Sequence, residues 1–347
     1  MALRAAQSDL QCAACGGQCS YSPSDAALKC TSCGAVHPIA HDSSTDPARE
    51  FHYHPDTAHT EQTILTNTRT HQCRTCGGEV VFTGPALSER CAYCDGPVVL
   101  KAQEASYQTM GVIPFRITEA EAQERALAWV KARLAAPDDL PGIVSQGRVA
   151  GLYAPFWTFD SREAVNYLAR YRVKRGKNWE TRSTGGDMTV VFDDLLMPAS
   201  HHITPLIRDG ILHDFHPDSL RSYDPAYLAG FAAERHHQSV GEGLAANAAD
   251  KDLLIRNQIK KRINKNRIID LSYKTDTTGI RYRRILLPVW ILHYHYGDKP
   301  KKIVVCGIHG RTFGERPFSR LKLAGYAAAV SAATILIGWV WGAAQFI

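Results

Sequence analysis

The chain has 347 residues, of which 45% are hydrophobic and 21% are charged, and this composition is typical of a folded protein rather than a disordered one. Its length allows two or three domains with a sizeable core. Ten cysteines would suggest disulfides in a secreted protein, but residues 1–17 contain no apolar segment of the kind found in signal peptides. We therefore expect metal-binding thiolates in a reducing cytoplasm.

The charge is distributed unevenly along the chain. Residues 1–105 carry seven Lys/Arg and eleven Asp/Glu, a net charge of −4, whereas residues 106–347 carry 33 and 23, a net charge of +10. Nucleic-acid affinity depends largely on Lys and Arg that neutralise phosphates. The net negative charge of the N-terminal part is therefore the opposite of what a DNA-binding zinc finger needs.

Two sets of four cysteines share one spacing, because each has two Cys-x-x-Cys pairs separated by fourteen residues. The sets are Cys12, Cys15, Cys30 and Cys33, and, 61 positions later, Cys73, Cys76, Cys91 and Cys94. Four thiolates satisfy Zn²⁺ in tetrahedral geometry, and glycine after a second cysteine relieves backbone strain. The insert is long enough for a short β-hairpin. The pattern predicts two structural zinc ions, with a redox or iron centre as the alternative.

These sets define the expected organisation of the N-terminal part. We expect zinc ribbon 1 in residues 1–40, a linker in residues 41–70 and zinc ribbon 2 in residues 71–104. The linker is rich in His, Ser, Thr, Asp and Pro and has little periodicity. Cys19 could compete as a ligand in the first ribbon.

Residues 105–320 have the pattern of a mixed α/β cytoplasmic domain with antiparallel hairpins. Thr118 with Glu121 forms a capping-box signal for a helix that continues through Leu134. Residues 224–268 are predicted to be mainly helical. Strands are expected at residues 111–117, 151–159, 164–173, 188–197 and 283–312, with turns at residues 174–178, 183–187 and 297–300. The fold class predicted for the whole chain is therefore α+β.

The 25 residues from Leu323 contain no charged side chain. A bilayer core of about 30 Å needs about 20 helical residues, so residues 323–346 are predicted to form one transmembrane helix, with a buried soluble helix as the alternative. Trp339 and Trp341 are suited to a membrane interface. The span is preceded, and not followed, by basic residues: Arg316, Arg320 and Lys322. The positive-inside rule then predicts a tail-anchored, single-pass protein of a bacterial inner membrane, with residues 1–322 in the cytoplasm.

Other polar groups give weaker signals. His293 and His295 lie two residues apart in an expected strand and could form a metal pair, but the sequence identifies no third ligand. Asp193 and Asp194 could be an acid/base pair, although a polar turn at a strand end is commoner. Cys306 is predicted to be a small buried hydrophobic residue.

Three basic clusters could bind anionic lipid or nucleic acid, or simply face solvent. They are Lys260, Lys261 and Arg262 with Lys265 and Arg267; Arg281, Arg283 and Arg284; and Lys299, Lys301 and Lys302. No phosphate-binding loop, zinc-protease motif, nucleophile elbow or dinucleotide fingerprint occurs. An ATP-driven motor therefore has no evident nucleotide site, and no catalytic residue is predicted.

Several stretches together resemble a bacterial family that carries an N-terminal TFIIB-type double zinc ribbon, often with a membrane segment. These stretches are residues 73–96, 112–117, 151–160, 191–200, 223–234, 283–296 and 310–319. Such sequences are often labelled primosomal protein N′ (replication factor Y), a superfamily II helicase, but the resemblance to that helicase is confined to the paired ribbons. Relatives resemble membrane-anchored adaptors that act in envelope stress with phage-shock-type coat proteins and flotillin-like proteins.

The sequence therefore favours a non-enzymatic membrane-anchored adaptor or scaffold whose zinc ribbons recruit protein partners. The alternative is a nucleic-acid-binding ribbon protein of the replication or transcription type without its own motor. An enzyme that uses His293, His295 or the Asp193–Asp194 pair is a third hypothesis, with little to support it.

Overall fold

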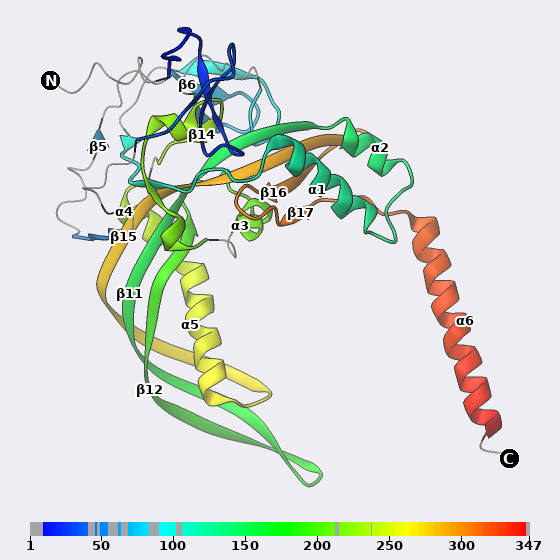
Figure 1. Cartoon of the computed structure of the whole chain (residues 1–347). Coiled ribbons are helices and arrows are strands. Elements are labelled where there is room, and N and C mark those ends of the chain that lie inside the picture. Colours follow the sequence, from blue (N-terminus) through cyan, green and yellow to red (C-terminus); the bar gives the residue numbers. More distant parts are fainter. Residues whose placement is uncertain are drawn as a thin grey trace.

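The computed structural model describes residues 10–40, 46, 49–54, 62–63, 69–82, 90–101, 106–211, 215–236 and 238–344 (Figure 1). Most of the expected linker and the middle of the second ribbon's insert lie outside these residues. The described chain is a mixed α+β structure with two four-cysteine clusters and one apolar helix near its C-terminus. Figure 1 shows a central body from which a long curved β arm and this helix both project.

The strands are short except in the arm. They are β1 (Cys19–Ser22), β2 (Ala27–Cys30), β3 (Val36–His37), β4 (Phe51–His52), β5 (Gln62–Thr63), β6 (Arg69–Cys73), β7 (Glu79–Phe82), β8 (Val98–Lys101), β9 (Ser106–Tyr107), β10 (Gly111–Val112), β11 (Arg148–Arg175), β12 (Asn178–Pro198), β13 (Arg221–Ser222), β14 (Ala232–Glu234), β15 (Ile268–Tyr296), β16 (Lys299–Cys306) and β17 (Thr312–Gly314). The helices are α1 (Glu119–Lys131), α2 (Leu140–Ser145), α3 (Pro205–Ile211), α4 (Val240–Ala246), α5 (Ala248–Ile263) and α6 (Arg320–Ala344), with 3₁₀ turns at Pro217–Ser219 and Pro225–Leu228.

One sheet of twelve strands connects nearly every part of the molecule. Its main path runs β13-β10-β15-β11-β14-β7-β6-β8, while β12 pairs with β11, β16 with β15 and β17, and β4 with β15. The first ribbon has its own sheet, β1-β2-β3, and β5 pairs with β9. Strands β7, β6 and β8 belong to the second ribbon. Because β7 pairs with β14, this ribbon continues the main sheet and does not form a separate sheet.

The body buries both faces of this sheet. Alternate side chains of a strand point to opposite faces, and those of β15 divide accordingly between two cores. Leu286 and Trp290 pack with α1, α2 and the first ribbon, whereas Leu287 and Val289 pack with α3 and the second ribbon. The buried cysteines of the first ribbon therefore belong to one core, and those of the second ribbon belong to the other.

The arm consists of the distal parts of β11, β12 and β15. From Ser161 outward the ladder between β11 and β12 continues without a register shift to Arg175 and Asn178, on either side of Gly176, whose φ is +60°. The turn expected at residues 183–187 is wrong, because Gly185 and Gly186 lie within β12 and pair with Leu168 and Tyr167. Two adjacent glycines are typical of a turn, but here cross-strand pairing outweighs that local preference.

Helix α5 packs along the arm. Ile255 and Ile259 are buried against Val165, Tyr167 and other arm residues. The expected helix from Asp224 is only partly correct, since Asp224 caps a 3₁₀ turn and β14 intervenes before α4 and α5. Helix α1 begins with the expected capping box but ends at Lys131, which leaves Leu134 77% exposed beyond it.

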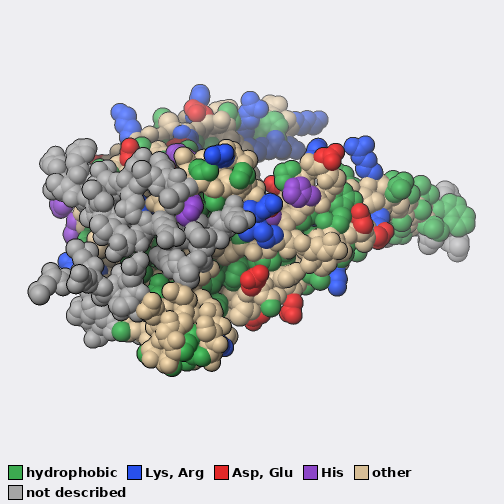
Figure 2. All heavy atoms as spheres, turned by 90° about the horizontal axis from the view of Figure 1, so that it is seen from above, with side chains coloured by type: hydrophobic (Ala, Val, Ile, Leu, Met, Phe, Trp, Pro, Cys, Tyr) green, Lys and Arg blue, Asp and Glu red, His purple; other side chains and the backbone are tan. Residues whose placement is uncertain are grey.

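The contacts that the structure describes between helix α6 and the body come from the first turns of the helix. Lys322 Nζ donates to the Ala136 carbonyl at 2.9 Å, and the Tyr326 hydroxyl donates to the Leu134 carbonyl at 3.0 Å. The segment from Arg320 to Trp339 is long and apolar enough to cross a membrane, and none of it is buried. Figure 2 shows this helix as a projection covered by hydrophobic side chains.

Candidate metal centres

The structure brings each predicted set of four cysteines together. The ligand atoms within each set all lie within 4.8 Å of one another. In the first set Sγ of Cys12 lies 3.6 Å from Sγ of Cys33, and Sγ of Cys15 lies 3.5 Å from Sγ of Cys30. The corresponding pairs in the second set, Cys73–Cys94 and Cys76–Cys91, are 3.5 and 3.8 Å apart. A tetrahedron with Zn–S bonds of about 2.3 Å has edges of about 3.8 Å, so both sets have the dimensions of a four-thiolate metal site.

The backbone of each Cys-x-x-Cys turn explains these distances. In the second set the Gly77 N–H donates to the Cys73 carbonyl at 3.0 Å, and the Cys73 N–H donates to the Gly78 carbonyl at 2.9 Å. Gly77 has a φ of +75°, a left-handed conformation that glycine adopts without steric cost. Asp95 occupies the equivalent position in the other turn, with a φ of +63°. Each Cys-x-x-Cys turn, called a knuckle below, therefore directs its two sulfurs inward.

Backbone N–H groups also point at the sulfurs. The Thr75 N–H donates to Cys73 Sγ and the Tyr93 N–H donates to Cys91 Sγ, both at 3.3 Å. Such bonds stabilise negative charge on sulfur. Four thiolates this close repel one another unless a cation lies between them, and the donor set is that of zinc or an iron centre.

The first set has further donors beside it. Cys19, which the sequence indicated as a competitor, is 4% exposed and forms a second group with Cys12 and His37, whose ligand atoms also lie within 4.8 Å of one another. His37 Nε2 lies 3.2 Å from Cys12 Sγ, and this hydrogen bond lowers the pKa of Cys12 to about 5. The sequence interpretation missed His37, although its position four residues after Cys33 could have suggested it.

Three side chains of the body donate hydrogen bonds to backbone carbonyl oxygens in the second knuckle of the second ribbon. Arg148 Nη2 donates to Cys91 O at 3.1 Å, His293 Nε2 to Ala92 O at 2.9 Å, and Lys302 Nζ to Tyr93 O at 3.3 Å. Arg148 Nε also pairs with Asp95 Oδ1 at 2.5 Å. Burial lowers the pKa of His293 to about 4, so a neutral imidazole makes its bond.

A buried polar network holds the first knuckle of the same ribbon. The Tyr93 hydroxyl donates to Glu234, which is 2% exposed and also accepts a bond from Ser200 at 2.7 Å. His202 donates from Nδ1 to Glu234 at 3.0 Å and from Nε2 to the Cys76 carbonyl at 3.0 Å. The bond with Glu234 raises the pKa of His202, which fits an imidazolium that donates from both nitrogens.

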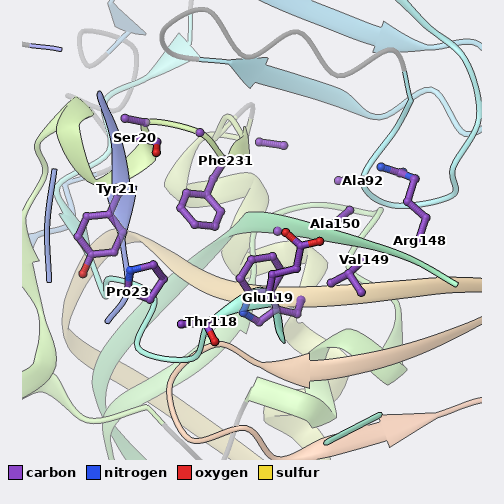
Figure 3. A pocket seen from close by; sticks show the side chains of 15 residues that line it. Ser20, Tyr21, Pro23, Ala92, Thr118, Glu119, Arg148, Val149, Ala150 and Phe231 are labelled. Carbon is purple, nitrogen blue, oxygen red and sulfur yellow. The ribbon is translucent and has the colours of Figure 1, made fainter. Parts of the chain in front are cut away.

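A cavity of about 450 Å³ lies between the two ribbons and the body (Figure 3). Ser20 and Tyr21 line it from β1, Ala92 from the second ribbon, and Glu119 and Phe231 from the body. The first ribbon contacts the body beside this cavity, where the Tyr21 N–H donates to the Ala229 carbonyl at 2.9 Å.

The remaining candidates have other surroundings. His293 contacts the second ribbon while His295 is exposed, and the described residues place no third metal ligand beside this pair. Asp193 groups with Glu50 and Asp160, and burial together with Glu50 raises the pKa of Asp160 to about 7. Asp194 forms an ion pair with Arg283, whose side chain is 2% exposed. Cys306 is fully buried in the core.

One relative is found among curated proteins. The uncharacterized protein YdjG of Bacillus subtilis (strain 168) is 27% identical over 239 residues, which cover 65% of this chain and 68% of YdjG. No family model and no solved structure matches the chain.

Proposed function

We propose that the protein is a non-enzymatic, single-pass membrane adaptor whose two zinc ribbons present a surface for protein partners at the cytoplasmic face of a bacterial inner membrane. The observation that carries this proposal is the combination on one body of two closed four-thiolate clusters and a fully exposed apolar helix. Four protein ligands fill the coordination shell of zinc, which suits a structural rather than a catalytic ion.

The ribbons are suited to recruitment because of their charge and their setting. Their segment of the chain is acidic, and the cavity between the two ribbons joins surfaces from both of them. The resemblance to double zinc-ribbon proteins points to partners such as phage-shock-type coat proteins or flotillin-like proteins in envelope stress. The basic residues Arg316, Arg320 and Lys322 beside the apolar helix support a cytoplasmic body under the positive-inside rule.

Membrane attachment is tested by deletion of residues 323–347. The shortened protein should move from the membrane to the soluble fraction, and an unrelated transmembrane helix fused at residue 322 should restore attachment. A deletion variant that stays with the membrane would contradict the anchor.

Metal binding and recruitment are tested together by affinity purification from solubilised membranes, with metal analysis of the product. We expect two zinc ions per chain, and one in either Cys12→Ser/Cys15→Ser or Cys73→Ser/Cys76→Ser. Partners should be lost with the ribbons, whereas Cys306→Ala, a cysteine removal outside both clusters, should keep both zinc and partners. Unchanged partners in both double variants would count against recruitment.

The alternative is a nucleic-acid-binding ribbon protein without a motor, and the exposed basic residues Lys260, Lys261 and Arg262 favour it. It requires binding of DNA or RNA with a steep salt dependence. Absence of binding at low salt would remove it.

A further inference from the structure

The distal arm carries a concentrated positive charge. We define the distal arm as residues 168–188 of β11 and β12 together with residues 260–272 at the end of α5 and the start of β15. It contains eleven Lys/Arg and three Asp/Glu, a net charge of +8, whereas the whole chain has +6. The rest of the molecule is therefore slightly negative, and the positive charge of the protein resides in this one projection.

The basic side chains of the distal arm all face solvent. They are Arg170, Arg172, Lys174, Arg175, Lys177, Arg182, Lys260, Lys261, Arg262, Lys265 and Arg267. Glu180 pairs with Arg175 and Arg182, and Asp270 pairs with Arg170. Among the described residues, no carboxylate lies within ion-pair distance of the other eight.

Packing brings the two halves of this surface together. The Arg172 N–H donates to the Arg267 carbonyl at 3.1 Å, which fixes the segment after α5 against β11. The Arg267 guanidinium lies 4.0 Å from the ring centroid of Trp179. The sequence showed only the cluster after residue 260, because the basic residues of β11 are far from it along the chain.

The structure removes the other two basic clusters from consideration as a comparable surface. Arg283 and Arg284 are each 2% exposed, and Arg281 pairs with Glu50 at 2.9 Å. Lys301 pairs with Glu315, and Lys302 contacts the second ribbon. Arg281 and Lys299 are the exposed members of those two clusters, whereas every basic side chain of the distal arm is exposed.

We propose that the distal arm binds the headgroups of anionic lipids in the same membrane that α6 enters. This inference rests on the proposed function in one respect, the insertion of α6. Basic residues near an anionic leaflet are attracted to it. Trp179 is 44% exposed at the tip, and an amphipathic ring of this kind is suited to the headgroup level.

The arm binds along the surface and does not enter the hydrocarbon. From Phe159 to Arg175 the strand extends about 50 Å at about 3.3 Å per residue, and Figure 1 shows it projecting from the same side of the body as α6. A bilayer crossed by α6 in this orientation would contain the arm, and its exposed arginines and lysines exclude that. The inserted protein therefore turns about residues 315–319, which form no helix or strand.

The contacts that set the present orientation of α6 are few: the bonds of Lys322 and Tyr326 to the Ala136 and Leu134 carbonyls and one ion pair. Lys322 pairs with Asp138 at 2.5 Å, but the Asp138 side chain is 90% exposed, and exposed ion pairs stabilise little. A nucleic acid would also match the charge of the arm, and its capture in place of lipid is one outcome of the test below.

The test is photo-crosslinking of the full chain in nanodiscs. The photoreactive amino acid p-benzoylphenylalanine replaces Asn178 at the arm tip or, as a control, Ser24 in the first ribbon; both residues are exposed. Discs contain phosphatidylcholine alone or mixed with phosphatidylglycerol. We expect lipid capture from position 178 in the mixed discs, little capture in phosphatidylcholine alone, and none from position 24.

Charge variants make the test specific. Lys174→Gln/Lys177→Gln should lower capture by about fivefold for each lysine lost, whereas Lys29→Gln/Arg74→Gln, which removes two exposed charges from the ribbons, should leave it unchanged. Equal capture in both kinds of disc, or capture of an added oligonucleotide in place of lipid, would overturn the proposal. Flotation of discs with the protein reports the anchor separately, so a protein that floats without capture refutes the arm alone.

Discussion

The bonds from Arg148 to the second ribbon should stabilise the second knuckle of that ribbon against local opening. Its guanidinium bonds to Asp95 and to the Cys91 carbonyl, and its side chain is 35% exposed. A hydrogen bond to a charged group contributes about 1.5–3 kcal/mol, and partial exposure reduces this. Arg148→Met keeps the apolar stem, so we expect the knuckle to lose about 2 kcal/mol of protection against opening, which is a factor of about 30.

Peptide-resolved alkylation of the cysteines measures this opening. Cys91 and Cys94 should react about 30-fold faster in Arg148→Met than in the wild type, while the four cysteines of the first ribbon provide an internal reference. Arg90→Met is the matched control, because Arg90 contacts the same Asp95 carboxylate at 3.2 Å but is 62% exposed. That change should have an effect of less than about 0.5 kcal/mol. Unchanged reactivity in Arg148→Met, or equal acceleration in both ribbons, would refute the reasoning.

Two further predictions concern the core. Burial lowers the pKa of His293 to about 4, so as the pH falls the unfolded chain binds a proton at this position before the folded chain does. The contribution of neutral His293 to the free energy of unfolding should therefore be complete above pH 6.5 and should decline towards pH 4, by up to about 3 kcal/mol. Chemical unfolding of His293→Gln should lack this part of the decline, and identical pH profiles for variant and wild type would contradict the prediction. Ile259→Ala removes a fully buried side chain between α5 and the arm and should lower the free energy of unfolding, measured with denaturant, by about 2–5 kcal/mol. Leu253→Ala, at a residue that is 54% exposed, should lower it by less than about 0.5 kcal/mol. Similar losses in both variants would refute the packing argument.

Features set by neighbouring residues were predictable from the sequence. The spacing of the cysteines brought each set together because one tight turn directs both sulfurs of a Cys-x-x-Cys pair inward. Thr118 and Glu121 form the expected capping box for the same reason, since both partners lie within one helical turn. The two-residue turn at Gly297–Asp298 likewise joins β15 to β16.

Features set by distant residues were not predictable. The contact of Arg148 with Cys91 joins positions 57 residues apart, and that of His293 with Ala92 joins positions 201 apart. Burial of Arg283 beside Asp194 depends on strand pairing that a single sequence does not reveal. The arm was missed because its long strands were expected only in part, as separate strands at residues 164–173 and 188–197, with a turn at residues 183–187 and no strand at residues 268–282.

The long ladder between β11 and β15 has a consequence for how the chain folds. Arg148 pairs with His293, 145 positions later, and the body of the sheet depends on this ladder. Closing so long a loop costs entropy before any contact offsets it, and such topologies fold slowly. Until β15 has been synthesised, the edge of β11 that pairs with it has no partner for its backbone hydrogen bonds. We therefore expect the nascent protein to depend on chaperones that shield unpaired strands.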